Sequence, residues 1–277
     1  MDILCPFMLL LDPMIRKTVS NFVENLQKKA RYSFTKCEIA MALGLKPSTL
    51  SKGLQRLKKA GRIAMIRRGF YVVIPLEYST TGMIPADWFI DDLMKFLKQP
   101  YYVGVLTAAT LYGASHQQPQ EYQVVVNCHT RMIHTNNLRI RFFQKKTLSR
   151  TPLQKTKGYT GSLPISSPAA TAMDLVRFAP AIGGLDTVLT VLVELVEKII
   201  PEDLLSVSKQ EADRCYIQRL GWLLEQTNKP ELADKLLQWF KKQKSVKTPL
   251  DVSTPITGFH KDSRWQVIVN TKPQSDI

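Results

Sequence analysis

The stretch EIAMALGLKPSTLSKGLQRLKKAG, residues 38–61, constrains the fold of this chain more than any other segment. A short apolar segment, with Ser33 or Thr35 suited to cap its start, ends at Gly44. Pro47 suits the first turn of a second segment, in which three leucines recur at helical spacing. The pattern predicts two helices joined by a tight turn, and the second helix is rich in polar and basic residues.

The residues on either side of this helical pair predict a larger module. Upstream, Pro13–Lys29 has apolar residues at helical spacing. Downstream, the β-rich runs Ile63–Ile66 and Phe70–Ile74 flank Arg67-Arg68-Gly69, which indicates a hairpin. Three helices followed by a two-stranded hairpin is the order of a winged helix, so we expect a winged helix-turn-helix at the N-terminus.

The remaining two thirds of the chain predict a second, larger domain. We expect an α+β protein, with the N-terminal winged helix-turn-helix followed by a larger mixed α/β domain that has a helical C-terminal portion. The expected boundaries are 1–12 for an N-terminal arm, 13–78 for the winged helix-turn-helix, 79–85 for a linker and 86–277 for the α/β domain.

Several elements of the larger domain are expected from local patterns. In NLRIRFFQ, apolar residues alternate with Arg139 and Arg141, which predicts a strand with one buried and one basic face. Residues 144–166 are expected to be rich in loops, and a helix is expected from Ser167 or Pro168 to Phe178, with residues 171–174 facing outward. Other expected helices are 86–97, 185–200, 208–226 and 230–244, and 265–270 is expected to be a strand.

Basic residues are concentrated in two blocks. Residues 1–80 hold 14 Lys and Arg against 5 Asp and Glu, and residues 122–173 hold 8 basic residues and no acidic one. From Lys28 to Arg68, Glu38 is the only acid. Such blocks indicate a polyanionic partner, with solubility alone as the alternative.

The candidate DNA-binding residues lie opposite the leucine stripe of the second helix and at the hairpin tip. Recognition helices present their N-terminal part to base edges, where a Gln can pair with adenine and a Lys or Arg with guanine or a phosphate. At the tip, Arg67 and Arg68 are expected to meet phosphates or the minor groove, although basic tips also occur merely for solubility. The candidates on the helix are Lys46, Ser48, Thr49, Ser51, Lys52, Gln55 and Arg56.

A second candidate patch comes from the block between Arg131 and Lys157. It has three interpretations: an extension of the DNA footprint, a surface for RNA or a toxin, or a solvated basic strand and loop. The candidate residues are Arg131, Arg139, Arg141, Lys145 and Lys146.

Motifs for catalysis and for metal or cofactor binding are missing from the sequence. No Asp or Glu is followed two residues later by Lys, as a restriction-type nuclease requires, and neither GxxxxGK[ST] nor HExxH occurs. Cys128, His129 and His134 are close in sequence, but their spacing fits no standard zinc pattern. We therefore expect no enzyme activity, no cofactor and no metal.

The cysteine spacing and the hydropathy of the chain indicate in which cellular compartment the protein works. The four cysteines are scattered without a CxxC pair, which suits a reducing environment. No apolar run is long enough for a membrane span, and the apolar start MDILCPFMLLLDP lacks the features of a signal peptide. These patterns predict a cytoplasmic protein without a membrane partner.

Three segments carry a resemblance to a known family. YYVGVLTAATLYGASHQQPQEYQVVVN, GSLPISSPAATAMDLVRF and QRLGWLLEQ, in this order after the expected winged helix, resemble the AbiEi-like antitoxins of type IV abortive-infection toxin–antitoxin systems. Tyr112 stands where the family pattern has a His before the Gly, and we expect its role to be packing.

The resemblance implies a function for each part of the chain. It implies an N-terminal winged helix that represses its own operon by binding inverted repeats of double-stranded operator DNA, with two copies on one operator. It also implies a C-terminal domain that counteracts a nucleotidyltransferase-like toxin without requiring a stable complex, and a protein that is a monomer in solution or pairs on DNA.

Two other function classes stay open from the sequence. One is a transcriptional regulator whose larger domain senses a ligand or partner unrelated to any toxin, and a toxin-like gene directly downstream would argue against it. The other is an enzyme acting on nucleic acid, which the missing acid–lysine motif disfavours.

Overall fold

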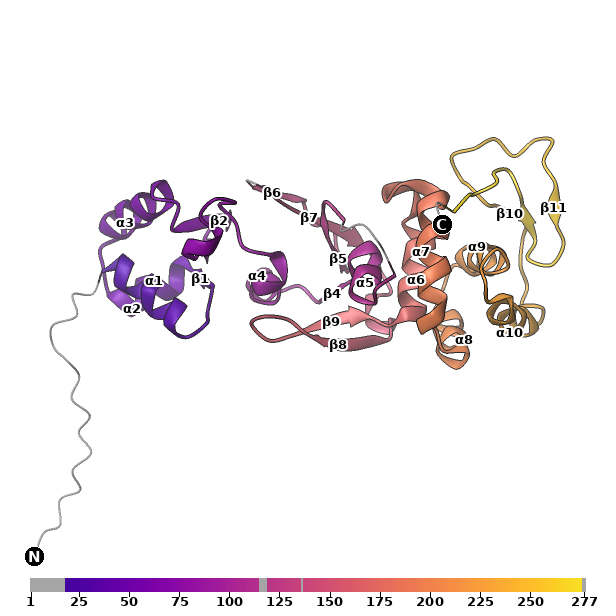
Figure 1. Cartoon of the computed structure of the whole chain (residues 1–277), viewed down its shortest axis with the longest axis horizontal. Helices are drawn as coiled ribbons and strands as arrows, with labels where there is room; N and C mark the ends of the chain where they lie inside the picture. Colours follow the sequence, from indigo (N-terminus) through magenta and orange to yellow (C-terminus); the bar gives the residue numbers. More distant parts are fainter. Residues whose placement is uncertain (1–17, 115–118, 136, 276–277) are drawn as a thin grey trace, which may run out of the picture. The chain divides into compact units, whose positions relative to one another are not determined.

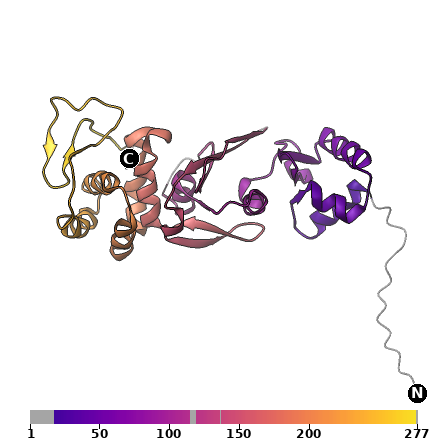
Figure 2. The ribbon, with the colours of Figure 1, turned by 180° about the vertical axis from the view of Figure 1, so that it is seen from behind.

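The computed structural model describes residues 18–114, 119–135 and 137–275. Contacts divide the chain into two compact units, Met1–Pro85 and Ala86–Ile277. We call them the N-terminal unit and the C-terminal unit, and each is described by itself (Figures 1 and 2). The expected N-terminal arm and the expected helix start at Pro13 lie outside the described residues.

The described part of the N-terminal unit contains three α-helices and a three-stranded antiparallel sheet of order β1-β3-β2 (Figure 1). The hairpin of β2 and β3 agrees with the prediction, whereas β1 was missed because it spans three residues and pairs with β3, far along the chain. The elements are α1 (Val19–Lys28), β1 (Ser33–Thr35), α2 (Lys36–Leu43), α3 (Pro47–Lys59), β2 (Ile63–Arg67), β3 (Phe70–Val73) and the 3-10 helix η1 (Leu76–Tyr78).

Local sequence signals explain where α2 and α3 begin and end. Thr35 caps α2 through a capping box: its hydroxyl accepts from the Glu38 amide, and the Glu38 carboxylate accepts from the Thr35 amide. Gly44 ends α2 with φ +62°, a conformation that costs a residue with a Cβ about 1–2 kcal/mol. Pro47 then occupies the first position of α3.

The core of the N-terminal unit lies beneath α3. Leu50, Leu54 and Leu57 are buried and join a cluster with residues of α1, α2 and the sheet. Gly53 lets α3 approach α1 closely, since a Cβ at this position would lie 2.7 Å from Val19 Cγ2. The polar side of α3 is therefore the side left for a partner.

The C-terminal unit is built on a six-stranded mixed sheet of order β6-β7-β5-β4-β9-β8. Residues 144–166, expected to be rich in loops, instead contain the antiparallel hairpin of β8 and β9. That prediction was wrong because β8 is polar on both faces and gives no alternating hydrophobic signal. The strands are β4 (Tyr101–Val103), β5 (Tyr122–Val126), β6 (Ile133–Thr135), β7 (Leu138–Gln144), β8 (Leu153–Lys157) and β9 (Ser162–Ser166).

Helices cover both faces of this sheet. Tyr101 and Tyr102 are adjacent on β4, so their side chains point to opposite faces. The Tyr101 hydroxyl donates to Asp91 on one side, and the Tyr102 hydroxyl donates to Asp174 on the other. The covering elements near the sheet are η2 (Ala86–Trp88) and α4 (Ile90–Leu97) at the Asp91 side, α6 (Pro168–Arg177) at the Asp174 side, and α5 (Val105–Leu111), which packs on α6.

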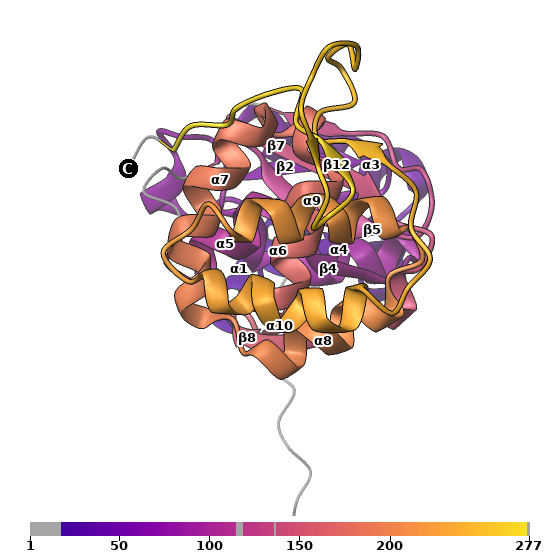
Figure 3. The same ribbon diagram turned by 90° about the vertical axis from the view of Figure 1, so that its right-hand side faces the viewer.

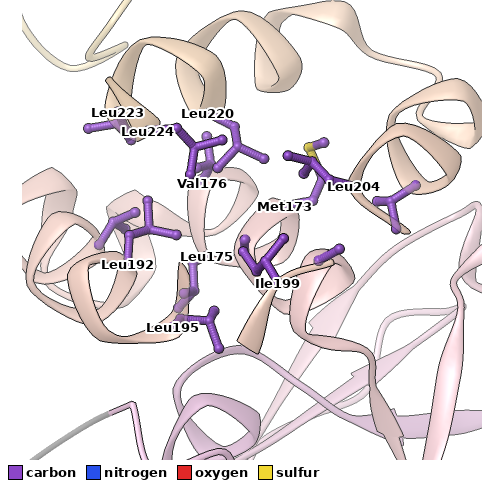
Figure 4. Packing of buried hydrophobic residues seen from close by; sticks show 14 of the residues in the cluster. Met173, Leu175, Val176, Leu192, Leu195, Ile199, Leu204, Leu220, Leu223 and Leu224 are labelled. Atoms are coloured by element: carbon purple, nitrogen blue, oxygen red, sulfur yellow. The ribbon is translucent and has the colours of Figure 1, made fainter. Parts of the chain in front are cut away.

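Further helices pack around α6 to form the largest core. Figure 4 shows buried side chains such as Met173, Leu192 and Leu220 meeting between these helices, and Figure 3 shows α9 beside α10, which are in contact. The single helix expected over 208–226 is instead the end of one helix, which stops at Gln210, and a second helix, which begins at Arg214. The helices are α7 (Gly184–Leu195), α8 (Pro201–Gln210), α9 (Arg214–Leu224) and α10 (Pro230–Phe240), with short 3-10 helices η3 (Leu148–Arg150), η4 (Ala179–Ala181) and η5 (Val196–Lys198).

The chain ends in a small sheet of order β10-β12-β11, from β10 (Thr248–Pro249), β11 (Lys261–Asp262) and β12 (Val267–Ile268). The expected strand 265–270 is thus present but shorter. The expected fold class, α+β with a helical C-terminal portion, is confirmed. One detail was wrong: residues 171–174, expected to face outward, are completely or almost completely buried because α6 is surrounded by the sheet and by α7, α8 and α9.

Candidate nucleic-acid interface

The exposed side of α3 carries the first group of candidate residues. The buried leucines take one side of the helix, and the polar residues are left on the other. All of them are exposed: Lys46, Ser48, Thr49, Ser51, Lys52, Gln55 and Arg56.

Helical geometry divides these residues between two flanks of α3. Thr49 lies on the same side as Gly53, which packs on α1. Ser51 lies on the opposite flank, where its hydroxyl is 3.4 Å from Lys36 Nζ of α2. Lys52 and Gln55 lie between these flanks and face away from the leucine stripe, so they are the residues best placed to reach a groove.

The β2–β3 hairpin supplies the second group. Gly69 has φ +88° and makes the turn, while the pairing shifts register between Met65 and Arg67. Arg68 is exposed at the tip, and Arg67 is half-buried. The two tip arginines are therefore not equivalent, and Arg68 is the more accessible of the two.

The acid within this basic region is already neutralised. The Glu38 carboxylate accepts two hydrogen bonds from the Arg31 guanidinium, at 2.5 and 2.9 Å, in addition to its capping role. Glu38 is the one acid between Lys28 and Arg68, and its carboxylate is already paired with Arg31, so this stretch presents mainly positive charge.

The second candidate patch is not one surface. Arg131, Arg139 and Lys146 are exposed, as predicted. Arg141 is half-buried: its guanidinium donates to the carbonyl of Ala181 at 2.9 Å and pairs with Glu121 at 3.4 Å. The face of β7 that was expected to be basic and exposed is therefore partly covered, because η4 packs over it at Arg141.

Lys145 was wrongly assigned to this surface. Its side chain is only 6% exposed, and its ammonium lies 2.8 Å from Asp174 Oδ1. The other oxygen of Asp174, which is fully buried, accepts the Tyr102 hydroxyl at 2.7 Å. Burial, then the neighbouring Asp174 charge, raises the pKa of Tyr102. Lys145 thus belongs to a buried network that joins the sheet to α6.

Other cations of the same basic block lie at a different edge of the sheet. Lys155 and Lys157 are exposed on β8, which is one edge strand, whereas Arg139 lies on β7 beside the opposite edge strand β6. Four strands separate β6 from β8. A single charged block in the sequence is therefore divided between two places.

Tyr112 has the packing environment expected for it. Its hydroxyl lies 2.7 Å from the Ser166 carbonyl and 3.1 Å from Gln154 Oε1. Burial raises the pKa of Tyr112 to about 12. It therefore remains a neutral hydrogen-bonding group that ties the end of α5 to the β8–β9 hairpin.

Within residues 18–114, 119–135 and 137–275, no three His, Cys, Asp or Glu side chains gather as a metal site would require. Among the same residues, no helix has the length and apolar character needed to cross a membrane.

Comparison with known families addresses the C-terminal unit. Residues 102–226, from β4 to just beyond α9, match the model of the AbiEi antitoxin C-terminal domain. The chain resembles the AbiEi-like antitoxins. This match confirms the resemblance carried by the three sequence segments, and it supports an antitoxin role in a toxin–antitoxin system. No curated protein matches the chain.

A solved structure shares the fold of this chain over most of its length. The crystal structure of the RV2827C protein from Mycobacterium tuberculosis matches with a TM-score of 0.65 and 14% sequence identity. The match covers 93% of this chain and 91% of that chain. At this identity the likeness concerns the fold alone.

Proposed function

We propose that this chain is a DNA-binding antitoxin of a type IV toxin–antitoxin system that represses its own operon. In this proposal residues 13–78 form a winged helix-turn-helix, 79–85 a linker and 86–277 the antitoxin domain. One observation carries the DNA-binding part: α3 presents an exposed basic face beside a hairpin with an exposed tip arginine, and Glu38, the one acid between Lys28 and Arg68, is engaged by Arg31.

Operator binding is proposed to use both groups of residues. Lys52 and Gln55 on α3 would read bases, and Arg68 at the tip would contact phosphates. Two copies would occupy the two halves of an inverted repeat in the upstream DNA. Since both the DNA and the toxin's effects lie inside the cell, the protein would work in the cytoplasm.

The test is a titration of the chain against its own upstream DNA at several salt concentrations. Gln55→Ala should cost about 1–3 kcal/mol and relax preference at one base position. Arg68→Ala should weaken all sequences evenly and reduce the salt slope by about 1. Lys209→Ala, at an exposed position of α8 in the other unit, is the control and should change neither the affinity nor the salt slope. Absence of any complex at low salt would refute the proposal.

The antitoxin part is proposed to reside in the C-terminal unit, which carries the family match. It would counteract a nucleotidyltransferase-like toxin, with or without direct contact. The experiment is co-expression of the chain with the product of a toxin-like neighbouring gene. Unchanged toxicity in the presence of the folded chain would contradict this part alone.

The same two assays can distinguish a DNA-binding role from an antitoxin role for the exposed cations near β6 and β7. The triple variant Arg131→Ala/Arg139→Ala/Lys146→Ala changes the exposed cations and leaves out Arg141, which is half-buried, and Lys145, which is buried. Lost operator binding would place these cations on the DNA footprint. Lost neutralisation with operator binding intact would place them on the antitoxin surface.

A further inference from the structure

A notch of about 170 Å³ lies between α3 and the β2–β3 hairpin in the N-terminal unit. We call it the α3–hairpin notch. It lies on the Ser51 flank of α3, and none of its lining residues is acidic. The lining residues are Lys36, Ser51, Leu54, Gln55, Lys58, Met65 and Tyr71.

Three elements build the notch. Ser51 and Lys58 lie on one flank of α3, and Gln55, four residues after Ser51, borders the notch from the outward side of the helix. Met65 and Tyr71 are directly paired across β2 and β3, so their side chains lie on the same face of the hairpin. Lys36 enters from the first residue of α2.

The notch has a basic rim and an apolar floor. Lys36 and Lys58 are exposed, and the Ser51 hydroxyl lies beside the Lys36 ammonium. The floor consists of buried Leu54, the Met65 side chain, which is 38% exposed, and the ring of Tyr71, which stacks on Phe34 behind it. Ammonium groups above an apolar surface match a sugar–phosphate unit, in which a charged phosphate adjoins an apolar ribose face.

The position of the notch indicates which sugar–phosphate unit of a DNA duplex would bind there. A recognition helix enters the major groove and a wing tip approaches the neighbouring minor groove. One DNA strand separates these two grooves, and in the proposed binding mode it would pass between α3 and the hairpin. The α3–hairpin notch is the hollow at this junction.

We propose that the α3–hairpin notch binds a single sugar–phosphate unit of the operator strand, with Lys36 and Lys58 contacting the phosphate and Met65 and Tyr71 contacting the sugar. This inference rests on the proposed DNA-binding function. It adds two phosphate-contacting lysines that the sequence did not identify, and it makes Ser51 a backbone contact instead of a base reader.

The experiment is binding of the full-length chain to operator duplexes that carry one neutral methylphosphonate linkage at successive positions. Wild type should lose affinity, roughly eightfold at 0.1 M salt, when the linkage in the notch is neutral. Lys36→Ala/Lys58→Ala should bind the unmodified operator more weakly, with a salt slope smaller by about 0.9 because one phosphate contact is lost, and should lose nothing further at that linkage.

A matched control and a competitor keep the result specific. Lys28→Ala/Lys29→Ala removes the same charge from exposed positions of the same unit and should retain the methylphosphonate effect. Inorganic phosphate should compete no better than chloride at equal ionic strength, because the site is built for a phosphate held in a duplex.

The outcomes separate this inference from the proposed function. If wild type does not bind its operator, the proposed function fails first. If wild type binds and the Lys36/Lys58 variant still loses affinity at the same linkage, the notch assignment is overturned. Preferential competition by inorganic phosphate would also overturn it, in favour of a free-anion site. Circular dichroism of each variant verifies that the fold is intact.

Discussion

Lys145 and Lys146 are neighbours in the sequence with opposite environments. Lys146 is exposed, whereas Lys145 is buried against Asp174 in a network completed by Tyr102. A buried ion pair contributes little compared with apolar packing, but removal of one partner leaves an uncompensated charge in a low-dielectric interior. The two lysines therefore provide a matched pair for measuring the network.

Lys145→Met should lower the free energy of unfolding by about 3–5 kcal/mol, because Asp174 loses its cation while remaining buried. Lys146→Met should change it by less than about 0.5 kcal/mol. Urea denaturation followed by circular dichroism measures both. Equal effects of the two substitutions would show that the Lys145–Asp174 pair is not formed.

At the scale of elements, close approach of α9 to the C-terminal segment depends on one glycine. A Cβ at Gly221 would lie 2.3 Å from the ring of Trp265, which is fully buried. The indole N–H of Trp265 donates to Glu225 on the same side of α9, at 2.8 Å. The absence of a side chain at Gly221 therefore lets the Trp265 ring approach the helix closely.

Gly221→Ala should destabilise the chain by about 1–3 kcal/mol, since the ring or the helix must move to admit the methyl group. A change in tryptophan fluorescence should accompany the loss of stability. Gly161→Ala, in the β8–β9 turn where a Cβ meets nothing within 4 Å, is the control. A fully stable Gly221→Ala protein with native fluorescence would contradict the described packing.

On the scale of the whole molecule, the C-terminal unit holds several tyrosines in their neutral form. Burial raises the pKa of Tyr101, Tyr102 and Tyr122 above the ordinary value, and that of Tyr112 to about 12. In the unfolded chain these hydroxyls ionise near pH 10. The native state therefore binds more protons than the unfolded state above this pH.

Stability should accordingly be unaffected by these tyrosines below about pH 10 and should fall as the pH rises through 10 towards 12. Absorbance at 295 nm reports tyrosine ionisation, and circular dichroism reports unfolding. The late-titrating tyrosines should ionise together with loss of structure. Complete ionisation near pH 10 with the fold intact would refute their burial.

The sequence by itself determined the elements whose signals are local. The Thr35 cap, Gly44 and Pro47 predicted the ends of α2 and α3 because capping and φ restrictions act within a few residues. The helix beginning at Ser167 was predicted for the same reason. The order of apolar segments was sufficient to predict an α+β chain and the resemblance to AbiEi-like antitoxins.

Only the tertiary structure decided which charges reach the surface and which are buried. Asp174 and Lys145 are 29 residues apart, and nothing in either segment indicates that β7 and α6 meet. The pairing of β1 with β3 and the α3–hairpin notch likewise depend on contacts between distant residues. Local sequence patterns encode backbone conformation, whereas tertiary packing decides which side chains are buried and which groups they contact. The candidate site depends on the local patterns and on the packing.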